Sequence, residues 1–128
     1  MRATVRTIDG SFEVDLDEGE VLGACDEPPP APAVTVPFPR VVAAAAAGST
    51  VVALVDAKPP LLVSHDAGRT WRESGRGLPP GRALAISQDD PDVVLYAARN
   101  RVYLSRDGGR FWSAVDVELP EITAVALL

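Results

Sequence analysis

The residues best able to do chemistry in this chain are a run of carboxylates, a lone thiol and a lone imidazole. The run is "DDPD" at 89–92, and clustered carboxylates are the ligands that Ca²⁺ prefers. The same letters describe an exposed turn in which Asp-Pro sets the backbone angles. We favour the turn and predict no metal site and no cofactor.

Cys25 is the only cysteine and His65 the only histidine. A single cysteine excludes an intrachain disulfide. A reactive or metal-binding thiol needs a basic or ligating neighbour. Because the sequence offers none close by, we expect Cys25 to be buried or inert and His65 to be a solvated turn residue.

Charge is distributed unevenly along the chain. Residues 1–30 hold eight acidic residues against Arg2 and Arg6, whereas residues 31–128 hold equal numbers of both signs, so the net charge is −6. Nucleic acids and anionic membranes repel such an acidic segment. We therefore expect neither of them as a partner.

Length and composition indicate one globular domain. The chain has 128 residues, 47% of them hydrophobic, which is enough for one core and too short for two. No apolar run approaches the roughly 20 residues that span a bilayer. The first ten residues, "MRATVRTIDG", lack the apolar stretch of a signal peptide. We expect a soluble, cytoplasmic protein.

Two similar octets show that the chain is a repeat protein. They are "SHDAGRTW" at 64–71 and "SRDGGRFW" at 105–112, separated by 41 residues. The same offset places "VALV" at 52–55 on "VVLY" at 93–96, and Leu-Pro pairs align downstream. A unit of about 40 residues is typical of a β-propeller blade.

Each repeat unit divides into four short β segments separated by turn residues. They are 41–47, 51–57, 61–64 and 70–74 in the first unit, then 83–87, 93–98, 101–105 and 111–117 in the second. Five consecutive alanines at 43–47 favour a helix by local propensity. They align with a segment held between two turns in the second unit, so we predict a strand.

The octet chemistry suits a hairpin turn. Gly supplies a position of positive φ, Ser and Asp hydrogen-bond to the backbone of the turn, and Trp packs its ring over the sheet. The predicted structural residues are Ser64, Asp66, Gly68, Thr70 and Trp71 in the first octet, and Ser105, Asp107, Gly109 and Trp112 in the second.

The rest of the chain adds three segments. Residues 1–27 predict an acidic β-hairpin or a degenerate blade, with strands at 4–8, 11–16 and 20–24 and an Asp-Gly turn after the first of them. Residues 28–37 predict a Pro-rich linker of polyproline II type, with an SH3 ligand as the alternative. Repeat units follow at about 38–78 and 79–119, and 121–128 aligns with the first strand of a further unit.

The octets look like the Asp-box, or BNR repeat, of sialidases, sortilin-type domains, xyloglucanases and photosystem II assembly factors. The stretch 85–112 resembles the inner-strand, Asp-Pro loop and Asp-box sequence of that superfamily. The resemblance covers about residues 38–128, although Phe111 stands where Thr is usual. It implies an all-β fold of antiparallel four-stranded propeller blades, two clear and one degenerate. In this family the boxes lie on the outer edge, away from the ligand-binding face.

The resemblance to sialidases does not extend to their catalytic residues. Sialidases combine an arginine triad with a tyrosine nucleophile, and "VPFPRVV" places Arg40 in only a weak likeness of their F-R-I-P stretch. Tyr96 and Tyr103 fall inside predicted strands, which favours packing. Xyloglucan hydrolases need two carboxylates facing each other across a cleft between two whole propellers. We predict no catalytic residue.

These observations favour a non-enzymatic, propeller-type protein-binding or scaffold module. Photosystem II assembly factors, which share the boxes, grip a protein partner through a basic patch. Two groups of arginines fit that role or an ordinary charged rim balanced by nearby acids: Arg69, Arg72, Arg76 and Arg82, then Arg99, Arg101, Arg106 and Arg110. The alternatives are a fragment or subunit of an Asp-box glycoside hydrolase, and a structural unit without a ligand.

The number of predicted strands is too small for a closed ring, because propellers have at least four blades. Residues 1–27 lack a first strand, and 121–128 is a first strand without followers. Unpaired edges invite association. We predict a homo-oligomer in which 121–128 of one chain completes the N-terminal blade of another, giving a six-bladed ring from a two-fold dimer. The alternative is that the chain is the first half of a longer protein.

Overall fold

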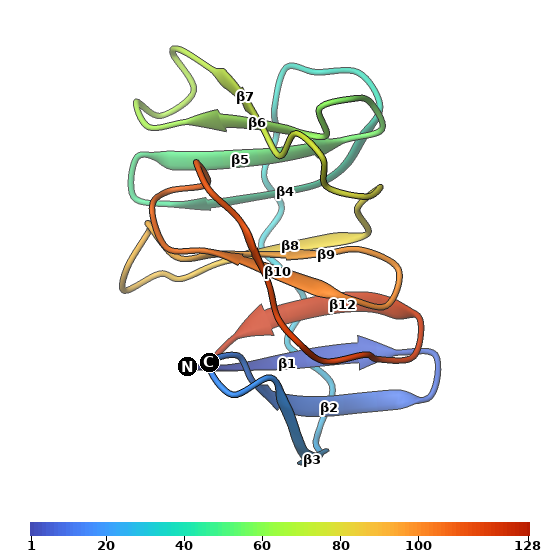
Figure 1. Ribbon diagram of the computed structural model, residues 1–128. Coiled ribbons are helices and arrows are strands. Elements are labelled where there is room, and N and C mark those ends of the chain that lie inside the picture. Colours follow the sequence, from blue (N-terminus) through green and yellow to red (C-terminus); the bar gives the residue numbers. More distant parts are fainter.

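The computed structural model describes all of residues 1–128 and contains twelve β-strands and no helix. The all-β prediction is therefore confirmed. The strands form three antiparallel sheets of four strands each, shown in Figure 1. The structure contains no helix that is long and apolar enough to cross a membrane.

The two repeat units form two of the sheets, with the same strand order. Sheet I has the order β4 (Val41–Ala47), β5 (Thr50–Val55), β6 (Leu61–Ser64), β7 (Arg72–Ser74). Sheet II has the order β8 (Ala83–Ile86), β9 (Val94–Ala97), β10 (Val102–Ser105), β11 (Ser113–Ala114). The alanine run is strand β4, as its alignment predicted. Its pairing with the valine-rich β5 overrides helix propensity.

Sheet III joins the first three strands of the chain to the last. Its order is β12 (Ile122–Leu127), β1 (Arg2–Thr7), β2 (Gly10–Asp15), β3 (Glu20–Ala24). Strands β12 and β1 pair in antiparallel register, with Ala3 opposite Leu127 and Val5 opposite Val125.

The sequence predicts this pairing between two different chains, whereas in this structure it lies within one chain. The last strand completes the N-terminal sheet of its own chain. The N and C ends lie side by side (Figure 1), so one chain supplies both strands without the entropy lost when two chains associate.

Sheet II lies between the other two and shares a core with each. One core joins it to sheet III through Ala3, Val5, Val14, Leu95 and Ile122, all fully buried. The other joins it to sheet I through Val52, Leu54, Leu61, Val94 and Tyr96. Strand β8 contacts both β4 and β12, so the first strands of the three sheets are neighbours.

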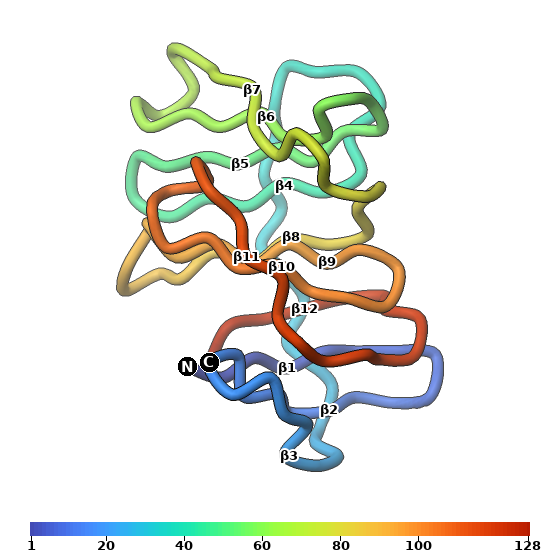
Figure 2. The backbone as a smooth tube through the Cα atoms, in the orientation of Figure 1, coloured from blue at the N-terminus to red at the C-terminus, as the bar shows by residue number.

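Residues 25–40 form no strand and are called the strap here. Figure 2 shows the strap running from β3 past the first strands of the three sheets to the start of β4. Together with small residues of those strands, such as Ala45, Ala85 and Ala126, it encloses a cavity of about 240 Å³. The ring of Phe38 meets Trp71 edge-on, with centroids 4.8 Å apart. The predicted linker therefore lies along the sheets, although most of its residues are exposed.

Cys25, at the start of the strap, is exposed. Of the two expected alternatives, a buried or an inert thiol, the buried one is wrong, since the strap crosses the surface rather than entering the core at this point. The Cys25 backbone N–H donates to the carbonyl of Ser11 at 3.0 Å.

Closure by β12 makes a prediction about stability. Ile122 is fully buried in the core between sheets II and III, so Ile122→Ala should lower the free energy of unfolding by about 2–4 kcal/mol. The matched control is Leu128→Ala, because Leu128 is 69% exposed and its truncation should have little effect. Urea unfolding followed by circular dichroism measures both. Equal midpoints for the two variants would show that β12 does not occupy this position.

Candidate functional site

The first octet is held by hydrogen bonds from its own side chains. Ser64 Oγ donates to Asp66 Oδ1 (2.8 Å) and accepts from the Gly68 N–H (2.8 Å). Asp66 accepts from the backbone N–H of Thr70 (2.8 Å) and from its hydroxyl (2.6 Å). The Trp71 indole donates to the Gly68 carbonyl at 3.0 Å. The octet is thus the predicted turn between β6 and β7.

The second octet repeats this arrangement between β10 and β11. Ser105 Oγ donates to Asp107 (2.8 Å) and accepts from Gly109 (2.9 Å), and Asp107 accepts from the Phe111 N–H (3.0 Å). The Trp112 indole donates to the Gly109 carbonyl at 3.2 Å. Phe111 has no hydroxyl, so the bond that Thr70 makes in the first octet has no counterpart here.

Two successive residues of each turn adopt positive φ. The glycines do so as predicted, at 88° for Gly68 and 87° for Gly109. The preceding residues, Ala67 at 60° and Gly108 at 76°, do so as well, which the sequence reasoning missed. Gly108 in the second octet was the sequence signal for this second position of positive φ, because glycine is the residue that adopts this conformation without strain.

The octet carboxyls have lowered pKa values. The Thr70 hydroxyl, followed by the Thr70 N–H and the Ser64 hydroxyl, holds the pKa of Asp66 far below its usual 3.8. The Phe111 N–H is the main cause of the lowered pKa of Asp107. Hydrogen bonds donated to a carboxylate favour its charged form. Both groups therefore act as anionic acceptors that organise the turns.

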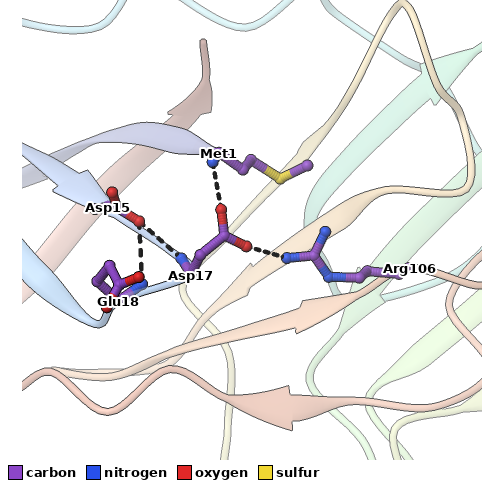
Figure 3. Close-up of polar contacts among 5 residues, drawn as sticks. All are labelled: Met1, Asp15, Asp17, Glu18 and Arg106. Atoms are coloured by element: carbon purple, nitrogen blue, oxygen red, sulfur yellow. Dashed lines mark hydrogen bonds and ion pairs between the residues drawn. The ribbon is translucent and has the colours of Figure 1, made fainter.

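A third carboxyl ties sheet III to the second octet. Asp17 Oδ2 lies 2.5 Å from the N-terminal amine of Met1, and Asp17 Oδ1 lies 2.5 Å from a guanidinium nitrogen of Arg106 (Figure 3). These two cations, the amine first, lower the pKa of Asp17. Asp15 Oδ1 accepts from the N–H groups of Asp17 and Glu18 and shapes the turn. Arg106 therefore connects sheet II to sheet III through this ion pair.

Other arginines of the two predicted groups are also paired. Glu121 lies 3.0 Å from Arg99 and 3.8 Å from Arg82, and the Arg99 contact is a hydrogen bond. For these residues and Arg106, the interpretation as a balanced charged rim describes the structure better than a binding patch does. The arginines near β7 are placed differently.

A groove of about 630 Å³ lies between sheets I and II and is lined in part by their last strands, β7 and β11. We call it the outer groove. Its apolar lining includes Val63, Tyr103 and Trp112, and its polar lining includes Arg72 and Arg110. The Ser74 hydroxyl donates to the Gly109 carbonyl, which connects β7 to the second octet at this point. The groove thus brings together residues of both repeat units.

Of the remaining candidates from the sequence, one packs in the core, one lies apart from this groove and one borders it. Tyr96 is fully buried, donates to the Pro79 carbonyl at 2.5 Å and has its pKa raised to about 12 by burial and by Tyr103. Arg40 is exposed before β4, with φ at 57°. His65 is exposed and reaches the rim of the outer groove.

The acidic run 89–92 forms a turn. Asp90 accepts from the Asp92 N–H at 3.2 Å, and the Asp90 N–H donates to Ser87 at 3.1 Å. No three His, Cys, Asp or Glu side chains come together as a possible metal site. The hydrogen bonds within residues 87–92 are those expected of an exposed turn.

Fold and site together define an all-β protein of three antiparallel sheets, with two matching hairpin turns and one groove between the repeat units. Comparison of the chain with protein-family models, with curated proteins and with solved structures found no match. The functional argument therefore depends on this chain alone.

The pKa of Asp66 predicts a pH dependence. Because its pKa is lowered in the folded state, the carboxylate stabilises the fold above the unfolded pKa, and this contribution is lost as the pH falls below about 4. Asp66→Asn should remove it, so unfolding midpoints of the variant should fall less steeply with acidification than those of the parent. Asp89→Asn, an exposed carboxyl in another turn, is the control. Parallel curves for parent and Asp66→Asn would contradict the assignment.

The second octet predicts two further losses of stability. Asp107→Ala should lower the free energy of unfolding by about 1–2 kcal/mol through lost turn hydrogen bonds. Trp112→Ala should cost more, about 3 kcal/mol, since its ring packs against the core of sheets I and II. Thermal melts monitored by near-ultraviolet circular dichroism rank them. The prediction fails if either variant melts like the parent.

Proposed function

We propose that the chain is a non-enzymatic, β-propeller-type module of the Asp-box (BNR) kind that binds or scaffolds a protein partner. The repeat supports the structural part of this proposal. Sheets I and II have the same strand order, and their octets share the Ser–Asp, Ser–Gly and Trp–Gly hydrogen bonds. Sheet III then serves as a blade whose first strand is β12.

One observation carries the binding role. The Ser and Asp side chains of the octets are occupied within their own turns, and Arg82, Arg99 and Arg106 have carboxylate partners. The outer groove, in contrast, combines unpaired cations with exposed aromatic surface. Tyrosine, tryptophan and arginine at a concave surface are typical of protein recognition.

A second copy of the chain is one candidate partner. Apolar side chains are exposed on one strand of sheet I and one of sheet III, Val41 and Val42 on β4 and Val21 and Leu22 on β3. Burial of such residues favours association. We expect light scattering to give a particle of twice the 13.5 kDa chain mass. A monomer would remove self-association and leave a different protein as the partner.

A pull-down from native lysate tests the function itself. Immobilised native protein should retain a partner that the same protein, thermally unfolded, does not retain, and the partner once purified should bind in a calorimetric titration. Failure to retain any partner would contradict the proposal. Hydrolysis of a fluorogenic sialoside or a β-glucan, lost in Arg40→Ala, would instead favour the glycoside hydrolase.

A further inference from the structure

The outer groove is lined by residues of two edge strands. It runs between β7 and β11, and each is the edge strand of its sheet. One side of each strand therefore lacks a strand partner, and exposed strand edges accept an added strand through main-chain hydrogen bonds. The volume of about 630 Å³ lies in the range of sites for small ligands and short peptide segments.

The charge of the groove is positive within an acidic protein. Arg76 lies 3.9 Å from Glu73, which balances it. Arg72 and Arg110 line the groove and have no carboxylate within ion-pair distance. The chain as a whole carries a net charge of −6, so the two guanidinium groups make the lining of this groove locally positive. They complement carboxylates, which arginine binds in bidentate geometry.

The aromatic part of the groove includes one residue, Phe111, whose exposed position is not explained by the stability of the fold. Phe111 is 79% exposed, and it replaces the threonine that binds the octet carboxylate in the first unit. The chain thus forgoes a hydrogen bond and leaves an apolar ring in water. Phe111 and Trp112 both contribute to the groove lining, where the exposed Phe111 ring offers apolar contact area to a ligand.

From these three observations we propose that the outer groove binds an extended acidic peptide that carries an aromatic or aliphatic side chain. Carboxylates of the peptide pair with Arg72 and Arg110, its apolar side chain packs on Phe111 and Trp112, and its backbone extends sheet I at β7. This inference rests on the proposed protein-binding function and specifies its site and the chemistry of its partner.

An acidic peptide fits the groove better than a nucleic acid does. Single-stranded nucleic acid also combines negative charge with rings that stack. Binding it, however, requires a basic track that neutralises many successive phosphates. Two unpaired arginines on a protein with a calculated pI of about 4.6 do not form such a track.

Fluorescence anisotropy with a defined probe tests the proposal. The probe is a short fluorescein-labelled peptide in which glutamate alternates with phenylalanine, and the comparison probes are its lysine counterpart and oligodeoxythymidine. The full chain should bind the glutamate peptide at low salt, more weakly at high salt, and bind neither comparison probe. Arg72→Glu with Arg110→Glu should weaken binding by about tenfold or more.

Two further variants separate this site from general effects. Arg69→Glu with Arg101→Glu makes the same charge change at exposed residues outside the groove and should leave affinity within about twofold. Phe111→Thr restores the hydroxyl of the first octet, so it should melt no lower than the parent and yet bind the peptide more weakly. Loss of binding in this variant cannot then be attributed to unfolding.

Each other result overturns the inference. Equal weakening by the two double variants would indicate attraction by overall charge. Tight binding of oligodeoxythymidine would indicate a nucleic-acid site. No binding of the glutamate peptide would exclude an acidic peptide as the ligand. A partner retained equally by the parent and by Arg72→Glu with Arg110→Glu would also refute the groove while the protein-binding function stands. A parent that retains no partner at all would refute the function itself.

Discussion

The pairing of β12 with β1 is the constraint on which the rest of the structure depends. Strand β12 provides the first strand of sheet III and, through Ile122 and Val125, part of the core against sheet II. It also lies beside β8, so it aligns sheet III with the first strands of the repeat units. Asp17, in the turn between β2 and β3, adds a second contact between sheets III and II by binding Arg106. Without β12, β1 would have an unpaired edge and this core would be open.

The repeat units were predictable because their information is local. Turn residues and the 41-residue offset located every strand of sheets I and II to within a few residues, and β6 coincides with its predicted range. The path of the strap, the exposure of Cys25 and the closure of sheet III within one chain were not predictable. Each of them depends on contacts between residues far apart in sequence, which periodicity and turn chemistry do not describe.

In the candidate site, too, some features were predictable from the sequence and others were not. Hydrogen bonds within each octet follow from residue types two to four positions apart, so the roles of Ser64 and Asp66 were apparent from the sequence. The outer groove unites β7 with the turn that follows β10, and no local pattern places them together. Its signals were present as the departure at Phe111 and the excess of arginine over lysine. The sequence could not separate paired arginines from unpaired ones.

The position of β12 has a consequence for the order of folding. Sheets I and II consist of strands that are consecutive in the chain, whereas sheet III waits for residues 122–127. Contacts of such long sequence separation form late, since loop closure costs entropy before the contacts repay it. During synthesis on the ribosome, β1–β3 emerge first and keep an open edge until the strand made last of the twelve arrives. The part of the chain that is translated first is therefore the part that needs protection from aggregation longest.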